Sequence, residues 1–299
     1  MPELPEVESI RLGLKKVLVG QNVLEVNVNE GKIVSSNSNI RVSNDKKITE
    51  FKSNIKNKSI ISVERRAKNI IIKLNDLSVI LIHLKMTGQL VYEDSKKNKI
   101  IGGHPIINSY TDNLPNKHTH IIFELDNGSL YYNDTRKFGY VLYYKSVEKA
   151  IEANHFKKIG PEPLEKDFTL KDFREGLLSK NKNLKQVLLE QEIVVGIGNI
   201  YADEICFASG LLPSKICNTL TSGEIESLYN NIKSILRLAI KHGGSSISDY
   251  LLADGSRGNY ARLHAVYGRA GKPCKVCGNV LEKSKMAGRT TVFCPFCQK

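Results

Sequence analysis

The chain has 299 residues, of which 41% are hydrophobic and 25% are charged. This composition is typical of a soluble globular protein, and the length predicts about two domains. Lys and Arg number 44 against 31 Asp and Glu, which gives a formal net charge of +13 at pH 7. Such an excess indicates a nucleic acid or an anionic membrane surface as partner. The chain has no apolar run near the ~18 residues of a membrane-spanning helix and no signal peptide. Nucleic acid in the cytoplasm is therefore favoured, and a basic protein without a polyanionic partner is the alternative.

The first half of the chain predicts one helix followed by β-structure. Val7, Ile10, Leu14 and Val17 recur at helical spacing behind Pro5, which suits the first turn of a helix. Short β-rich segments follow, separated by Asn, Asp, Gly or Lys turns, and predict a β-sandwich or barrel up to about residue 144. These segments read NVLEVNVNE, SIISVERR, NIIIKLN, SVILIHL, THIIFELD and SLYYND. The polar stretch 93–116, which contains two prolines, is predicted to be a long loop.

The second half begins with the proline-rich GPEPLEKD at 160–167, after which the pattern is helical up to residue 242. The helical segments read FTLKDFREGLLS, NLKQVLLEQ, NIYADEICFASG and GEIESLYNNIKSILRLAIKHGG. We therefore expect an α+β multidomain fold. Its parts are an N-terminal β-sandwich with a leading helix over residues 1–150, a linker over 151–168, a helical domain over 169–267 and a C-terminal β-hairpin over 268–299.

Four of the six cysteines form two C-x2-C pairs near the C-terminus: Cys274, Cys277, Cys294 and Cys297. Two such pairs on a hairpin place four thiolates around one Zn²⁺, and four protein ligands leave no open position, so this zinc would be structural. Two disulfides are the alternative, which a cytosolic compartment disfavours. Cys206 and Cys217 stand in apolar surroundings and are expected to be small buried side chains. Basic residues between the two pairs suit a DNA-backbone contact, although such a hairpin could equally mediate protein contacts.

Nine segments of the chain resemble one protein family, in order and over nearly the whole length. They read PELPEVE, RRAK, HLKMTG, KHTH, DTRKFG, KIGPEPL, GIGNIYADEICFASGLLP, VYGRAGKPC and AGRTTVFCPFCQ. The resemblance is to formamidopyrimidine-DNA glycosylase, a bacterial enzyme family that excises oxidised purines. It implies a helix–two-turns–helix element in the helical domain, a zinc β-hairpin, and a catalytic β-sandwich. It also implies damaged double-stranded DNA as partner, one structural Zn²⁺ per monomer, a monomeric state and a cytoplasmic location at the bacterial nucleoid.

The resemblance assigns the catalytic residues. After loss of Met1, the secondary amine of Pro2 would attack C1′ of the damaged nucleotide. An α-amino group titrates near pH 8, well below lysine at about 10.4, so more of it is unprotonated at neutral pH. Glu3 would be the general acid/base and Glu6 a supporting residue, while Lys68 matches a lysine linked to β-elimination. Arg289 matches the arginine that binds phosphate and is linked to δ-elimination. Interpreted without this resemblance, Pro2 would only stiffen the N-terminus, and Lys68 would be an ordinary charged residue between two strands.

Three further residues match the family's DNA wedge, which fills the space left by the everted nucleotide: Met86, Arg136 and Phe138. From the residues alone, Met86 would be a core side chain and DTRKFG a tight turn. His118 matches a phosphate contact, and the helix N-terminus at GIGN would bind a phosphate together with Asn199. A family DNA-contact position that can be basic falls on Asn181, between two lysines that could substitute for it. The Gly- and Ser-rich segment 245–260 resembles the family's lid over the everted base.

Three functional hypotheses remain open at this stage. The first is a bifunctional glycosylase and AP lyase for 8-oxoguanine and formamidopyrimidines, acting through a Schiff base on Pro2 and β,δ-elimination. The second is the sister branch, an endonuclease-eight-like enzyme for oxidised pyrimidines; Leu4 and the lid segment favour the purine branch. The third is a non-catalytic, basic zinc-finger DNA-binding protein, against which the set of Pro2, Glu3 and Lys68 argues.

Overall fold

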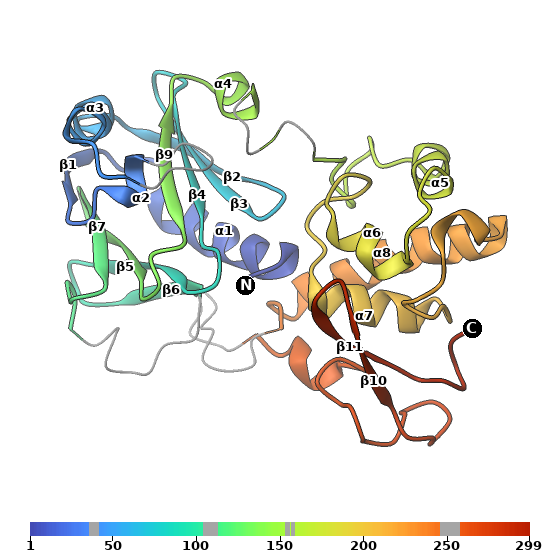
Figure 1. Cartoon of the computed structure of the whole chain (residues 1–299). Helices are drawn as coiled ribbons and strands as arrows, with labels where there is room; N and C mark the ends of the chain where they lie inside the picture. The colour runs from blue at the N-terminus through green and yellow to red at the C-terminus, as the bar shows by residue number, and fades with distance from the viewer. Residues whose placement is uncertain (36–41, 104–112, 153–155, 157–158, 246–257) are drawn as a thin grey trace. The chain divides into compact units, whose positions relative to one another are not determined.

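The computed structural model describes residues 1–35, 42–103, 113–152, 156, 159–245 and 258–299. The chain forms two compact units (Figure 1). Of the described residues, the sandwich unit contains 1–2, 6–35, 42–103, 113–152, 156 and 258, and the helical unit contains 3–5, 159–245 and 259–299. Three residues of the N-terminus therefore belong to the helical unit, although the chain continues directly into the sandwich unit.

Helix α1 (Leu4–Leu18) confirms the helix predicted at the N-terminus. Val7, Ile10 and Leu14 lie on its buried face in the core of the sandwich unit, as their spacing predicts. Glu6 lies in its first turn and two lysines lie in its last turn, where each charge opposes the helix dipole.

The sandwich unit consists of two antiparallel sheets (Figure 1). The first sheet has the order β1-β7-β8-β5-β6 and the second has the order β2-β3-β4-β9. The strands of the first are β1 (Val23–Val28), β5 (Gly88–Asp94), β6 (Lys99–Gly103), β7 (Thr119–Leu125) and β8 (Gly128–Asp134). Those of the second are β2 (Ile60–Arg66), β3 (Asn69–Leu74), β4 (Val79–His83) and β9 (Tyr140–Tyr144). The predicted β-sandwich is thus confirmed.

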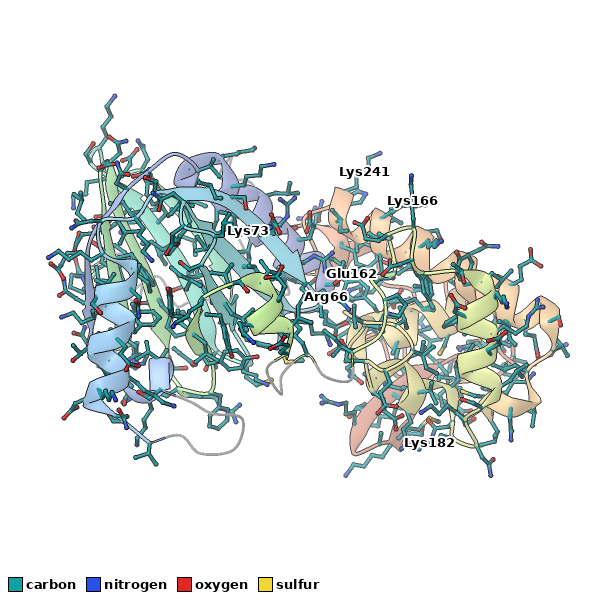
Figure 2. All side chains as sticks on the ribbon, turned by 90° about the horizontal axis from the view of Figure 1, so that it is seen from above. Arg66, Lys73, Glu162, Lys166, Lys182 and Lys241 are labelled. Atoms are coloured by element: carbon teal, nitrogen blue, oxygen red, sulfur yellow. The ribbon has the colours of Figure 1, made fainter. Side chains whose placement is uncertain are left out.

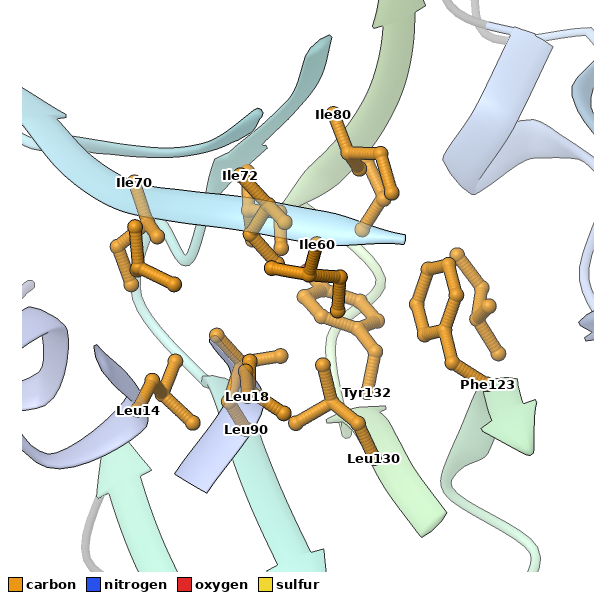
Figure 3. Close-up of a cluster of buried hydrophobic side chains, with 14 of the residues drawn as sticks. Leu14, Leu18, Ile60, Ile70, Ile72, Ile80, Leu90, Phe123, Leu130 and Tyr132 are labelled. Atoms are coloured by element: carbon orange, nitrogen blue, oxygen red, sulfur yellow. The ribbon is translucent and has the colours of Figure 1, made fainter. Parts of the chain in front are cut away.

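Alternate residues of both sheets meet in one hydrophobic core, together with the buried face of α1 (Figure 3). The side chains include Leu14 and Leu18 of α1, Ile60, Ile70, Ile72 and Ile80 of the second sheet, and Leu90, Phe123, Leu130 and Tyr132 of the first. Burial of this apolar surface, at roughly 25 cal/mol per Å², is the main force that holds the sheets together.

The sandwich unit also contains elements that the sequence did not predict. Helices α2 (Lys32–Ser35) and α3 (Asp45–Ile55) lie within the region expected to be β-structure. The Asn44 side chain caps α3, which buries only Phe51 and Ile55. The prediction of a long loop over 93–116 is wrong in part, because it contains β6, which pairs with β5 in the register Val91↔Ile101. Helix α4 (Val147–Glu152) follows β9.

The helical unit contains helices α5 (Leu170–Leu178), α6 (Leu184–Leu189), α7 (Asn199–Ala208) and α8 (Ser222–Lys241). They confirm the four predicted helical segments. Short 3-10 helices lie at Cys217–Thr219 and Tyr260–Leu263. Side chains of Thr169, Asn183 and Thr221 cap α5, α6 and α8, so local sequence marks where these helices begin. The unit ends in the hairpin β10 (Glu282–Met286) and β11 (Arg289–Phe293). None of the helices within the described part of the chain is long and apolar enough to cross a membrane.

Candidate functional site

The carboxylate of Glu3 lies at the N-terminus of α7, within the helical unit. Glu3 is 3% exposed. It accepts hydrogen bonds from the backbone N–H groups of Gly198 (2.8 Å), Ile200 (2.9 Å) and Tyr201 (3.3 Å). The three N–H groups belong to the first residues of α7 and the residue before it. The Glu3 carboxylate is therefore held in a fixed position.

This arrangement limits which N–H groups near GIGN are available to a DNA phosphate. The N–H groups of Gly198 and Ile200 are bonded to Glu3, and the N–H of Gly196 donates to Gln191 Oε1 at 2.7 Å. A phosphate contact at this helix N-terminus, with Asn199 adding its side chain, stays a prediction. The Oδ1 atom of Asn199 is buried and has no hydrogen-bond partner among the described residues.

Leu4 fixes the chain immediately after Glu3. Its N–H donates to the carbonyl of Gly196 at 2.9 Å, and its side chain is fully buried in the core of the helical unit. Gly196 has φ +87°, and a Cβ atom there would lie 2.5 Å from Leu4 Cδ1. Only glycine fits this close approach. Because Glu3 and Leu4 are both held by the GIGN loop, Pro2 directly precedes two immobilised residues.

Lys68 lies in the tight turn between β2 and β3 of the sandwich unit and is buried. The turn includes Ala67 at φ +52°, and the Arg65 guanidinium donates to the Ala67 carbonyl at 3.0 Å. Arg65 also binds Glu8 of α1 at 3.0 Å, and Arg11 binds the same carboxylate at 2.6 Å. Burial raises the pKa of Glu8, but the two guanidinium groups outweigh it and hold that pKa below its ordinary value. These ion pairs tie the turn that carries Lys68 to α1.

Glu6 is buried in the first turn of α1.

The three wedge residues lie on two loops of the sandwich unit. Met86 follows β4 and is 42% exposed, while Phe138 follows β8 and is 44% exposed. The prediction from residues alone that Met86 belongs to the core is therefore wrong. The guanidinium of Arg136 lies over the ring of Phe138, 4.5 Å from its centroid. An apolar side chain in water is available for contact with stacked bases. We refer to Met86, Arg136 and Phe138 as the wedge.

His118 precedes β7 in the same unit and is partly buried. Burial, with Lys117, His120 and Lys137 nearby, lowers its pKa below the ordinary value. The lowered pKa favours the neutral form of this ring.

Asn181 is exposed in the helical unit, before α6. Its two neighbours form ion pairs, Lys180 with Glu192 at 2.9 Å and Lys182 with Glu190 at 2.7 Å. Lys182 lies at the surface of this unit (Figure 2). Exposed ion pairs contribute about 0–1 kcal/mol, so either amine can exchange its carboxylate for a phosphate.

Tyr267 is a residue of this region that sequence reasoning missed. Its hydroxyl is hydrogen-bonded to the Asn199 side chain, and the charges of Glu3 and Arg289 also affect the pKa of this hydroxyl. Burial raises the pKa of Tyr267, and the hydrogen bond from Asn199 only partly opposes this. The structure thus brings Glu3, Asn199, Tyr267 and Arg289 into one polar cluster of the helical unit. The sequence feature that could have pointed to Tyr267 is the YGR motif that precedes the first cysteine pair.

The four cysteine Sγ atoms of the hairpin lie within 4.8 Å of one another. The Cys274–Cys297 and Cys277–Cys294 sulfur atoms are 3.9 and 3.5 Å apart. A Zn–S distance of ~2.3 Å gives a tetrahedron with edges of roughly 3.8 Å, so the sulfur set fits zinc, and both separations exceed the ~2.05 Å of a disulfide. The buried thiols of Cys206 and Cys217 have pKa values raised by burial, as expected for inert core residues.

A fully buried ion pair connects the hairpin to the helices. Lys185 Nζ of α6 lies 2.7 Å from Asp203 Oδ1 of α7, and both side chains are 0% exposed. The same amine donates to the carbonyl of Thr290 at 3.1 Å, and the other Asp203 oxygen accepts from Val292 N–H at 3.1 Å. Arg289 therefore stands at the start of a strand that is bonded to α7, the helix that holds Glu3.

The fold and the polar cluster define a class of protein: a β-sandwich and a helical unit that carries a four-cysteine hairpin. Family models match along the chain in the same order. The formamidopyrimidine-DNA glycosylase N-terminal domain matches residues 1–141, the formamidopyrimidine-DNA glycosylase H2TH domain matches residues 159–250, and the zinc finger found in FPG and IleRS matches residues 271–299.

Whole proteins agree with the domain matches. The chain is 38% identical over 299 residues to formamidopyrimidine-DNA glycosylase of Carboxydothermus hydrogenoformans and 39% identical over 302 residues to that of Streptococcus mutans, with full coverage of both. It is similar to the Lactococcus lactis Fpg in complex with DNA that contains an abasic site, with a TM-score of 0.85, 35% identity and 99% coverage of each chain. The chain belongs to the formamidopyrimidine-DNA glycosylase family.

Proposed function

We propose that this protein is a bifunctional DNA glycosylase and AP lyase that removes oxidised purines, 8-oxoguanine and formamidopyrimidines, from double-stranded DNA. The observation that carries the proposal is the arrangement of the N-terminus. Glu3 and Leu4 are bonded to the GIGN loop, so after loss of Met1 the amine of Pro2 would stand next to a fixed carboxylate. Family membership supports the glycosylase activity, and Fpg of Lactococcus lactis has been solved with DNA containing a benzylated Fapy-dG.

In the proposed reaction the unprotonated Pro2 nitrogen attacks C1′, and the damaged base leaves with the electron pair of the glycosidic bond. The sugar ring opens and an iminium ion forms between Pro2 and C1′. This cation accepts the electron pair released when the C2′ proton is removed, which breaks the C3′–O bond (β-elimination); δ-elimination then breaks the C5′–O bond. Glu3 is suited to transfer protons at the sugar because three hydrogen bonds hold its carboxylate in a fixed position. Lys68 would assist β-elimination, and Arg289 would bind the phosphate that leaves in δ-elimination.

The four-cysteine site would hold one structural Zn²⁺ per monomer, which closes the hairpin and orients Arg289. The wedge, His118, Asn181 and Asn199 would contact the duplex. The segment proposed as the lid over the everted base, 246–257, lies outside the described residues.

The test of the covalent mechanism is trapping with borohydride on a duplex that contains 8-oxoguanine. The mature chain should give a covalent protein–DNA complex, and a chain with an uncleaved N-terminal extension should give none because its Pro2 nitrogen is an amide. A C-terminal extension is the control for the added residues. Absence of the complex with a protein shown by intact mass to have lost Met1 contradicts the proposal.

Lys68→Ala should reduce strand cleavage after base release. Lys73→Ala is the matched control, because Lys73 lies on β3 of the same unit (Figure 2) and its amine pairs with Glu64 at 2.8 Å. Equal loss of cleavage in both variants would remove Lys68 from the mechanism.

Oxidised pyrimidines are a second candidate substrate, because a Lactococcus lactis Fpg has also been solved with DNA that contains an oxidised pyrimidine. Single-turnover excision of 8-oxoguanine and thymine glycol from otherwise identical duplexes decides between the two. Faster release of thymine glycol would assign the chain to the pyrimidine-specific alternative.

A further inference from the structure

Asp134, the last residue of β8, carries a buried carboxylate at the base of the wedge. It is 0% exposed. One oxygen accepts from the Thr87 hydroxyl and from the Arg136 N–H at 3.1 Å. The other accepts from the Gly139 N–H at 2.8 Å and from the Tyr132 hydroxyl at 3.4 Å. A buried charge is tolerated when donors satisfy it in this way.

These donors come from both loops of the wedge. Thr87 directly follows Met86, and Arg136 and Gly139 enclose Phe138. The Arg136 N–H also donates to the Thr87 hydroxyl at 3.1 Å, so the two loops are bonded to each other as well as to the carboxylate.

The backbone of Asp134 holds a third segment. Its N–H donates to the carbonyl of His118 at 3.0 Å, and its carbonyl contacts His120 Nε2 at 2.7 Å. One residue thus connects the positions of all four predicted DNA contacts of the sandwich unit.

The loops leave little room for another conformation. A Cβ atom on Gly139 would lie 1.8 Å from the Tyr132 hydroxyl, and one on Gly88 would lie 2.4 Å from the Leu84 carbonyl. Lys137, between Arg136 and Phe138, has φ +56° and pairs with Glu30 at 2.6 Å. The backbone conformation of the wedge is therefore set by close contacts and by the Asp134 carboxylate.

We propose that Asp134 is a positioning residue that holds Met86, Arg136 and Phe138 as one rigid element before DNA binds. The inference rests on the proposed function, because it assumes that these side chains enter the duplex. A preordered wedge loses less conformational entropy on insertion than two independent loops would.

Two variants separate positioning from general stability. Asp134→Asn keeps the size of the side chain but turns an NH₂ group toward one pair of donors. Thr87→Val keeps the volume of the side chain and removes only the hydroxyl that joins the two loops. It therefore tests the positioning role of Asp134 even if Asp134→Asn does not fold. Ser129→Ala is the matched control, since its hydroxyl donates to the Glu124 carboxylate at 2.6 Å at the opposite end of β8.

The assay uses a duplex with a tetrahydrofuran abasic analogue opposite 2-aminopurine, in which no bond is cleaved. Stopped-flow fluorescence then reports wedge insertion whether or not the protein is a glycosylase. In parallel, strand cleavage at an abasic site in single-stranded DNA measures chemistry that needs no wedge.

Asp134→Asn and Thr87→Val should slow the fluorescence phase by about 10²-fold, as expected for a displacement near 1 Å, and leave single-strand cleavage unchanged. Ser129→Ala should behave as the unmodified protein in both assays. An unchanged fluorescence phase in the Thr87 variant, or an equal slowing in the Ser129 variant, overturns the inference. Failure of the unmodified protein to cleave single-stranded abasic DNA would instead count against the proposed lyase activity.

Discussion

Gly198→Ala should inactivate the protein through Glu3 alone. Gly198 has an extended backbone, with φ −132° and ψ −156°, which alanine adopts without strain. A Cβ atom there would lie 2.3 Å from Glu3 Cδ and 2.5 Å from Oε1. Because the end of a side chain moves more easily than a helix terminus, the Glu3 carboxylate has to leave.

The size of the effect follows from the hydrogen bonds that are lost. The N–H groups of Gly198 and Tyr201 are buried, and each costs about 1–3 kcal/mol when it loses its acceptor, so the variant should lose about 2–6 kcal/mol of stability. Loss of a positioned general acid/base lowers the rate by about 10²–10⁴-fold. Urea unfolding and single-turnover excision of 8-oxoguanine measure the two quantities.

Gly223→Ala is the control, because nothing lies within 4 Å of a Cβ atom on this residue of α8. It should keep full activity and gain up to about 1 kcal/mol. In a Glu3→Ala background the obstructing atoms are gone, so Gly198→Ala should have no further effect on excision. Full activity and stability of Gly198→Ala in the unmodified chain would refute the argument.

Four further results are expected. Lys185→Met should lower the free energy of unfolding in urea by about 3–5 kcal/mol, because it leaves the Asp203 charge buried without its partner. Adding Asp203→Leu should restore much of the lost stability. A loss below this range in the single variant contradicts the prediction. Burial raises the pKa of Asp203 from 3.8 to about 6, although the charge and hydrogen bond of Lys185 oppose this shift. The contribution of Asp203 to stability should therefore be full below pH 4 and fall as pH rises through 6, a slope that Asp203→Asn removes in melting curves. Native mass spectrometry should detect one zinc per chain in the unmodified protein, and treatment with a chelator or Cys294→Ser should remove this zinc and weaken DNA binding. A metal-free native mass of the unmodified protein would contradict the zinc site. Affinity for DNA should fall with a log–log salt slope of about −0.9 per neutralised phosphate, and a flat response would contradict the role given to the net charge of +13.

The secondary structure was predictable wherever a local pattern repeated. Leu14 and its neighbours define α1, and the alternation through Ile70 and Ile72 defines a strand, because each pattern presents one apolar face to a core. Helix α3 escaped prediction because it buries only Phe51 and Ile55. Strand β6 escaped because its short KIIGG segment is specified by pairing with β5, a partner that local sequence does not reveal.

The exposure of Met86 could not be predicted either. A methionine next to a β-rich segment is compatible with the core and with the surface, and only the packing of the loop decides between them. The structure resolves the question because the loop is bonded to Asp134 through Thr87, which leaves Met86 in solvent.

The sequence by itself determined the parts of this protein. The spacing of the four cysteines predicts a metal site, the helix caps and apolar periods define most elements, and Pro2 is directly followed by the acid Glu3 in the covalent chain. These features depend on residues a few positions apart, so a local pattern is enough to reveal them.

The tertiary structure decided how these parts act together. Glu3 bonds to Gly198, 195 positions away, Tyr267 bonds to the Asn199 side chain, and Asp134 connects two loops of the sandwich. Hydrogen bonds between such distant positions leave no periodic trace in the sequence, because each needs only one donor and one acceptor that folding brings within about 3 Å.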